Sequence, residues 1–285
     1  MHDREVLTNY IGELVQHDAS LHLFAPDAKQ KWYLITSIDD YSRALLYADF
    51  WDRESTWAHI TAAQELCVKF GFPFEYYADQ HSIFRYVKHR DRFSPWMEFE
   101  KYTDDVDPQW KKVLKDCGIN VIYALSPQAK GKIERPYQWL QDHLVRSCLR
   151  AGVTDIEAGR ELLREEVQAY NWKRVHSTTG EIPMLRFQRA EREQQSMFRP
   201  FAIKSPFELT KDIFCLRMTR VVDSYRKISV QGTILHVPVV PPHEEVELRL
   251  SLDLPHQLTD IRFWYNKQCV GSQKMKIDDF PVVRF

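Results

Sequence analysis

The sequence contains no long apolar run of the kind that crosses a bilayer. Its first ten residues also lack the charged and then apolar pattern of a secretory signal peptide. We therefore expect an intracellular, cytoplasmic protein that does not enter a membrane. Repeats and low-complexity tracts are absent too, and a 44% hydrophobic content over 285 residues is enough for one sizeable domain and a smaller companion.

Cysteine is scarce and scattered. The chain has five cysteines, an odd number, and they form no CxxC pair and no cluster with histidine. This pattern indicates reduced thiols and argues against a zinc site. No Ser/His/Asp or Cys/His nucleophile pattern is present either. The net charge of −1 shows no excess of positive charge, but a local basic stripe would be enough for nucleic-acid binding, so charge alone neither establishes nor excludes it.

The most informative stretch is 126–135, which reads SPQAKGKIER. It follows a short apolar run at 121–125 that predicts a strand, and it precedes residues 137–145, whose apolar positions recur at helical spacing. Glu134 would therefore be held in the first turn of a helix. Three cations that would attract an anion surround it: Lys130, Lys132 and Arg135. A rigidly held acid among basic residues is typical of an acid that works on phosphates.

This stretch resembles the glutamate motif of the DDE transposases and retroviral-type integrases, in which a Gly-Lys-aliphatic-Glu-Arg run opens the helix bearing the third catalytic acid. The resemblance implies two aspartates upstream, and we assign them to Asp18 and Asp79. The motif 77–84, YADQHSIF, resembles the second-aspartate motif of bacterial insertion-sequence transposases. The segment 170–183 resembles the Tyr-Asn…His-Ser…Gly…Pro sequence that closes many integrase cores.

The hydrophobic patterns agree with such a core. They predict three consecutive antiparallel strands at 11–24, 31–38 and 43–50. A helix is predicted at 54–70, ending at Gly71, and it is followed by a strand that ends just before Asp79. In a strand–helix–strand arrangement, functional residues gather at the carboxyl ends of parallel strands.

Fifty-five positions separate Asp79 from Glu134, more than in retroviral-type integrases, so an insertion must lie between them. The charged stretch 86–107 is the obvious candidate, and we expect a loop or flap there. Further helices are predicted at 110–117, from Glu134 to about 150, and at 156–172 with an Asp155 cap.

The predicted fold is α/β. The resemblance implies an RNase H-like mixed five-stranded sheet flanked by helices, and the later chain predicts a small all-β barrel. We divide the chain into a catalytic core at 1–190 with an insertion at about 84–110, a linker at 191–210, and a barrel of five or six short strands at 211–285. The charged and Pro-containing part of that junction, 188–207, is expected to have little order.

The resemblance also implies the roles of the acids. Asp18 would bridge two Mg²⁺ (or Mn²⁺) ions, while Asp79 and Glu134 would each hold one. His17 and His81 flank two of the acids, and we expect them to support the acids by hydrogen bonds rather than to bind metal. Asp39 and Asp40 are adjacent carboxylates too, but a structural turn with Arg43 is the better interpretation.

The function this implies is DNA cleavage at an element's ends and strand transfer into target DNA, by a homomultimer assembled on DNA in the bacterial cytoplasm. Two alternatives stay open: a metal-dependent nuclease without strand transfer, and a non-catalytic DNA-binding remnant. Family members usually carry upstream helix-turn-helix domains, whereas Asp18 lies near the start of this sequence. We therefore expect a fragment of a longer transposase, or a truncated or repurposed product.

Overall fold

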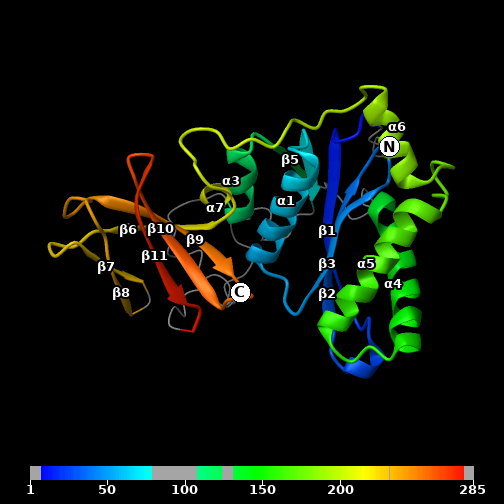
Figure 1. Ribbon diagram of the computed structural model, residues 1–285, viewed down its shortest axis with the longest axis horizontal. Helices are drawn as coiled ribbons and strands as arrows, with labels where there is room; N and C mark the ends of the chain where they lie inside the picture. The colour runs from blue at the N-terminus through cyan, green and yellow to red at the C-terminus, as the bar shows by residue number, and fades with distance from the viewer. Residues whose placement is uncertain (1–7, 79–107, 124–130, 231, 279–285) are drawn as a thin grey trace. The chain divides into compact units, whose positions relative to one another are not determined.

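A computed structural model describes residues 8–78, 108–123, 131–230 and 232–278, and for 131–138 it describes the backbone alone (Figure 1). The described residues fall into two compact units. Unit 1 takes in those of 1–84 and 114–201, and unit 2 takes in those of 85–113 and 202–285. Among the described helices, none combines the length and apolar composition needed to cross a bilayer.

Unit 1 is organised around a five-stranded sheet with the order β3-β2-β1-β4-β5. Its strands are β1 (Leu14–His22), β2 (Trp32–Asp39), β3 (Leu45–Trp51), β4 (Glu75–Ala78) and β5 (Asn120–Tyr123). The pairs β1–β2 and β2–β3 are antiparallel, whereas β1–β4 and β4–β5 are parallel. This mixed sheet, flanked by helices, has the RNase H-like arrangement, and it confirms the predicted fold class.

The helices of unit 1 begin and end where local chemistry dictates. The described helices are α1 (Thr56–Phe70), α4 (Gly131–Ala151), α5 (Ile156–Lys173) and α6 (Pro183–Arg192), and η1 (Pro26–Ala28) is a 3₁₀ turn. Helix α3 (Gln109–Asp116) is divided between the two units. Helix α1 starts because the Ser55 hydroxyl accepts a hydrogen bond from the Ala58 N–H, and it stops at Gly71. The carboxylate of Asp155 caps α5 in the predicted way.

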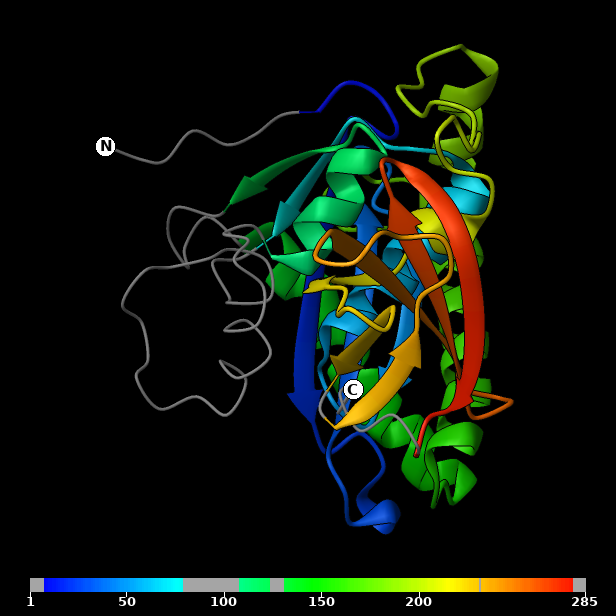
Figure 2. The same ribbon diagram turned by 90° about the vertical axis from the view of Figure 1, so that its left-hand side faces the viewer.

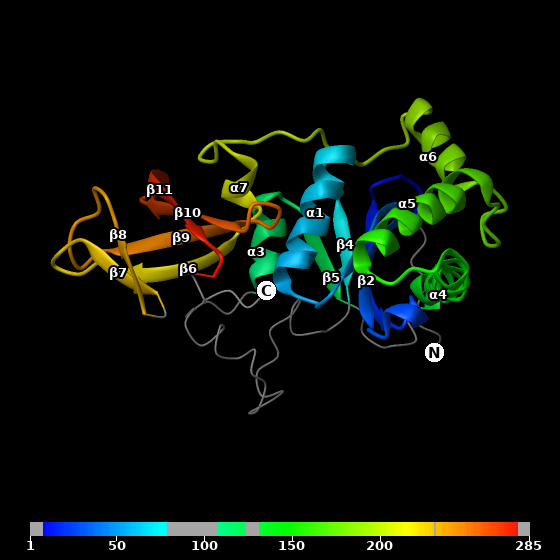
Figure 3. The same cartoon turned by 60° about the horizontal axis from the view of Figure 1, so that its bottom comes forward.

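The two faces of the sheet are covered by different helices (Figure 3). Helix α1 packs on one face through a cluster that includes Ile35, Tyr47 and Ala58. Helices α4 and α5 cover the other face through a larger apolar core that includes Leu34 and Leu144. Because burying such a side chain is worth about 1.5–3 kcal/mol, these two layers fix which residues of each strand face which helix.

The junction after α6 corrects one expectation. Helix α6 extends to Arg192, and the following residues are hydrogen-bonded into unit 1 rather than loosely ordered. Ile11 exchanges backbone hydrogen bonds with residues 195–197, and Phe72 exchanges two with Arg199. The prediction of a low-order linker at 188–207 was wrong in this part because the segment pairs with backbone far away in the sequence. We call residues 195–201 the strap.

The described part of unit 2 contains six strands, within the five or six predicted. They are β6 (Leu216–Val221), β7 (Lys227–Val230), β8 (Thr233–His236), β9 (Glu245–Asp253), β10 (Leu258–Tyr265) and β11 (Gln268–Lys276). Four of them form a sheet of order β11-β10-β9-β6, and β7 and β8 form a separate hairpin. The β strands predicted for the C-terminal part of the chain are present, and the closure of these strands into a small barrel stays a prediction.

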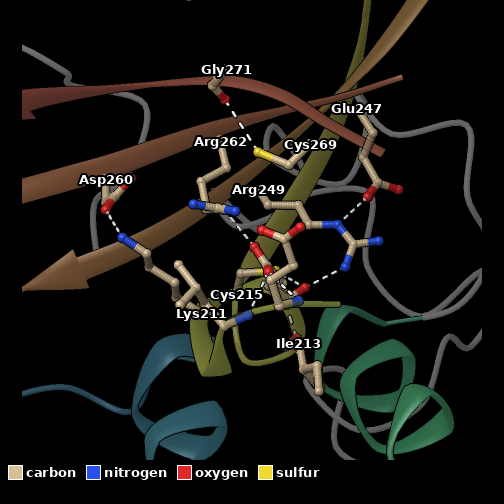
Figure 4. A network of polar contacts seen from close by, with 12 residues as sticks. Lys211, Ile213, Cys215, Glu247, Arg249, Asp260, Arg262, Cys269 and Gly271 are labelled. Atoms are coloured by element: carbon tan, nitrogen blue, oxygen red, sulfur yellow. Dashed lines mark hydrogen bonds and ion pairs between the residues drawn. The ribbon is translucent and has the colours of Figure 1, made fainter. Parts of the chain in front are cut away.

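A buried ionic network holds the short helix α7 (Thr210–Ile213) against this sheet (Figure 4). The carboxylate of Asp212, which has no solvent exposure, lies 2.5 Å from Nε of Arg262. The guanidinium of Arg249 donates to the backbone carbonyl of Asp212 and pairs with Glu247. Since a buried charge is costly unless it is paired, this network fixes the position of α7 on β9 and β10.

Candidate active site

Asp18 lies on the central strand of unit 1, where sequence reasoning placed it. It is half-buried on β1 and is paired across to Thr36 of β2. Because side chains alternate along a strand, Asp18 and Ser20 share one face of β1, and His17 belongs to the other.

The face that carries Asp18 is the one that α4 covers. The side-chain amide of Gln141 on α4 donates a hydrogen bond to the hydroxyl of Ser20. Strand β1 leads into η1 (Figure 2), and the turn between α4 and α5 lies at the same end of unit 1 as η1 (Figure 1). Strand β1 and helix α4 therefore run in the same direction and are in contact. The bond between Ser20 and Gln141 fixes how far along α4 each residue of β1 lies.

The other predicted site residues lie mostly outside the described residues. Asp79, His81 and Lys130 belong to ranges that the structure does not describe. Lys132, Glu134 and Arg135 lie in the first turns of α4, for which only the backbone is described. The structure thus places the backbone of Glu134 at the start of the predicted helix, and the predicted roles of all six residues stay predictions.

The strand register relates Asp18 to the chain that precedes Asp79. Gln16 of β1 pairs with Tyr77 of β4 in a parallel ladder. Asp18 comes two residues after Gln16, and Asp79 comes two residues after Tyr77 and directly after the last residue of β4.

His17 has partners on the face opposite Asp18. Its Nδ1 lies 2.9 Å from the hydroxyl oxygen of Ser37, and its Nε2 lies 2.8 Å from Nδ1 of His59 on α1. These contacts go to the α1 side of the sheet and not to the carboxylate of Asp18. The predicted role of His17 in supporting Asp18 stays a prediction. If His17 has this role, the two bonds described here would act through the backbone of β1 and not through contact with the Asp18 carboxylate.

Asp39 and Asp40 form the turn that the sequence indicated. Asp39 accepts hydrogen bonds from the backbone N–H groups of Gly12 and Ser42 and from the Ser42 hydroxyl. Asp40 pairs with Arg43 at 2.8 Å. Both carboxylates are buried and used in holding the β2–β3 turn, so they serve the fold.

The described residues contain no group of three or more His, Cys, Asp or Glu side chains arranged to hold a metal ion. Asp18 alone of the predicted acids has a described side chain, and it offers the hard carboxylate oxygens that Mg²⁺ and Mn²⁺ prefer. Its half-buried position on a rigid central strand suits such a ligand, so the donor chemistry fits a divalent ion.

Sequence reasoning missed the contact between Ser20 and Gln141. The signal was present in the alternation along β1, which places every second residue after Asp18 on the same face. It also missed that His59 would meet His17, because no local pattern relates a strand residue to a helix residue 42 positions away.

Two curated proteins are similar to the chain in sequence. Over 160 residues it is 30% identical to the putative transposase y4bF of Sinorhizobium fredii (strain NBRC 101917 / NGR234), which covers 56% of this chain and 33% of that protein. Over 172 residues it is 28% identical to the transposase for insertion sequence IS1202 of Streptococcus pneumoniae, which covers 60% of this chain and 35% of that protein.

The predicted resemblance to a transposase or integrase core is therefore confirmed, although the chain spans only about a third of the length of these curated relatives. No family model matches the sequence. Among solved structures, the chain is similar to the HTLV-2 integrase catalytic core domain in complex with magnesium, with 16% identity and a TM-score of 0.43 over 64% of this chain and 98% of that one. A second neighbour is the simian T-cell lymphotropic virus intasome in complex with PP2A regulatory subunit B56 gamma, with 11% identity and a TM-score of 0.48 over 96% of this chain and 79% of that one.

Proposed function

We propose that the chain is the catalytic part of a DNA transposase that cleaves phosphodiester bonds and transfers DNA strands with Asp18, Asp79 and Glu134. The observation that carries the proposal is the placement of Asp18 on the α4 side of the central strand, with α4 fixed there by the bond between Gln141 and Ser20. The transposase relatives support the same reading.

Helix geometry supports a meeting of Asp18 and Glu134. Seven residues before Gln141, Glu134 lies about two helical turns, or roughly 10.5 Å, back along α4 on the same side of the helix. Two residues before Ser20, Asp18 lies about 6.7 Å back along β1. Because β1 and α4 run in the same direction, both steps lead the same way, and the two acids would reach a similar height on facing elements.

The strand register supports the addition of Asp79. If the parallel pairing of Gln16 with Tyr77 continues for two residues, Asp18 and Asp79 become neighbours on adjacent strands. Adjacent strands lie about 4.8 Å apart, so their carboxylates would be close enough to share a metal ion. Without cations, three such acids would repel one another and raise one another's pKa values.

Bound divalent ions would neutralise charge at the phosphorus, activate the attacking oxygen and stabilise the leaving oxygen. In this proposal Asp18 would contribute to holding both ions, and Asp79 and Glu134 would each hold one. The acids do not act as nucleophiles. Their task would be to hold the ions, and through them the DNA.

We also propose that Lys130, Lys132 and Arg135 contact DNA phosphates beside Glu134, and that the protein pairs element ends as a homomultimer on bacterial DNA in the cytoplasm. Phosphate contacts make binding salt-dependent, so replacing the three cations with alanine should lower the slope of log affinity against log salt by about 2–3.

The test is a strand-transfer assay with pre-nicked DNA carrying the element's ends, a labelled target plasmid and Mg²⁺ or Mn²⁺. Glu134→Gln keeps the size of the side chain but removes its charge, and we expect metal-dependent joined product from the wild type and a loss of at least about 10³-fold in the variant. Glu157→Gln, at an exposed position of α5, is the matched control and should keep wild-type activity.

The products also separate the alternatives. Nicked plasmid without joined strands, still dependent on Glu134, would identify a nuclease instead. DNA binding without any product, unchanged in Glu134→Gln, would identify the non-catalytic remnant. Full activity in Glu134→Gln would disprove the assignment of this acid.

A further inference from the structure

A chain of hydrogen bonds crosses the face of the sheet opposite Asp18. It runs from the hydroxyl of Ser37 to Nδ1 of His17 over 2.9 Å, from Nε2 of His17 to Nδ1 of His59 over 2.8 Å, and from Nε2 of His59 to the Glu54 carboxylate over 3.2 Å. Both histidines and Ser37 are completely buried, while the side chain of Glu54 retains 21% exposure. We call these four residues the relay.

The chemistry of the groups gives the relay a direction. A carboxylate only accepts hydrogen bonds, so His59 must carry its proton on Nε2. When the His59 ring carries that one proton, it accepts at Nδ1, and the donor across the 2.8 Å contact is then the Nε2–H of His17. His17 in turn accepts at Nδ1 from the Ser37 hydroxyl. One carboxylate at the edge of the buried region thereby sets the tautomers of both rings.

The relay joins three elements at the height of Asp18. Ser37 lies directly across from His17 on β2. His59 lies on α1, and Glu54 lies two residues before the first residue of α1. His17 is the residue before Asp18, so the bond from its ring ties the backbone of β1 to α1 one residue, or about 3.3 Å, from the predicted metal ligand.

We propose that the relay positions Asp18. His17, His59, Glu54 and Ser37 are positioning residues that hold β1 against α1, and Asp18 is the ligand whose place depends on them. This inference rests on the function proposed above. A displacement of about 1 Å of a group in an active site costs on the order of 10²-fold in rate, so breaking the relay should produce a measurable loss of the rate of strand transfer.

Two substitutions at one position separate positioning from packing. His59→Leu fills the buried space with an apolar side chain but leaves Nε2 of His17 without its acceptor. His59→Asn keeps an oxygen near the place of Nδ1. We expect His59→Leu to remain folded and to lose at least about 10-fold in the rate of strand transfer at saturating DNA, with the KM for DNA unchanged. His59→Asn should lose less than about 3-fold, as should Glu65→Ala, a carboxylate elsewhere on α1 that serves as the matched control.

A purely structural role predicts the opposite order, because leucine suits a buried site better than asparagine does. Equal rates in wild type and folded His59→Leu would overturn the proposal. So would a loss in His59→Asn as large as that in His59→Leu.

Two readouts do not require the reaction. In protein labelled with ¹⁵N-histidine, long-range ¹H–¹⁵N spectra should show Nε2–H tautomers for both His17 and His59, and Glu54→Ala should disturb both. An Nδ1–H tautomer at either ring in the wild type would overturn the relay, whether or not the protein is active.

Titration with Mn²⁺, followed by electron paramagnetic resonance, should give about 10-fold weaker binding in His59→Leu than in the wild type. If the wild type binds Mn²⁺ but joins no DNA, the proposed function fails, and this comparison still decides the relay. Equal Mn²⁺ affinities in the two proteins would count against it.

Discussion

At the end of β2, Asp39 is an acid whose surroundings oppose its charge. Burial is the strongest influence and raises its pKa from 3.8 to about 6, with a smaller upward contribution from Asp40. The hydrogen bonds donated by Ser42 and by the Gly12 N–H act in the other direction and lower the pKa, but they do not outweigh burial.

The sign of the resulting pH dependence follows from linkage. Because the folded pKa of Asp39 lies above the unfolded value, its contribution to stability is fully present below about pH 4 and is lost as the pH rises through about 6. A shift of this size corresponds to about 3 kcal/mol. We expect the free energy of unfolding of the wild type, minus that of Asp39→Asn, to fall by about this amount between pH 4 and pH 7. Urea unfolding at fixed pH measures it, and a difference that stays constant with pH would contradict the assignment.

At the scale of elements, the strap explains two glycines that precede strands. Gly12 and Gly71 have φ angles of +71° and +98°, and each is pressed by the strap. A Cβ at Gly12 would lie 2.4 Å from the ring of Phe198, and one at Gly71 would lie 2.4 Å from the backbone oxygen of Arg199. The guanidinium of Arg199 also donates to the carbonyl of Gly118, just before β5. The strap thereby joins the chain at the starts of β1, β4 and β5.

Replacing Gly71 with alanine tests this role. The new side chain would meet the backbone oxygen of Arg199, which cannot rotate away, and we expect Gly71→Ala to lower the free energy of unfolding by at least about 3 kcal/mol. Gly152→Ala is a control for a positive φ alone, because Gly152 has a φ of +62° and nothing within 4 Å of its Cβ position. Gly71, with a φ of 98° and a ψ of −178°, lies in a region that is essentially restricted to glycine, so its backbone conformation adds to the loss expected there. Gly152→Ala should cost only about 1–2 kcal/mol. Equal losses in the two variants would show that the strap contact contributes nothing beyond backbone strain.

The elements themselves were largely predictable, since their signals are local. The 54–70 helix was read from its apolar period and from Gly71, and α1 runs from Thr56 to Phe70. The strap was missed because its pairing joins Arg199 to Phe72, and no local sequence pattern at either residue predicts pairing with the other. The site divides in the same way. Asp18 was assigned because the glutamate motif at 126–135 implies an aspartate upstream, and that assignment stays a prediction. The bonds of His17 to His59 and of Gln141 to Ser20 depend instead on packing between elements that lie far apart in the sequence.

At the scale of the whole molecule, the cysteine thiols of both units can be compared with the reduced state that the sequence predicts. All five cysteines are free, which agrees with the predicted reduced state. Cys67, Cys117, Cys148 and Cys215 are buried, and only Cys269 is partly exposed. Burial raises the pKa of Cys148 to about 11 and raises the pKa values of Cys67 and Cys215 as well. Since the thiolate is the reactive form, these three thiols are protected both by poor access and by a low thiolate fraction.

We therefore expect the native protein at pH 8 to react rapidly with Ellman's reagent at one thiol, and the protein unfolded in guanidinium to react at all five. Cys269→Ser should abolish the rapid reaction without lowering the midpoint of thermal unfolding by more than about 2 °C, because its thiol makes only one weak hydrogen bond, to the carbonyl of Gly271. Cys148→Ser, which places a hydroxyl in the core between α4 and α5, should instead lower the midpoint by several degrees and leave the rapid reaction intact. Two or more rapidly reacting thiols in the native wild type would mean that one of the cores opens far more readily than its burial implies.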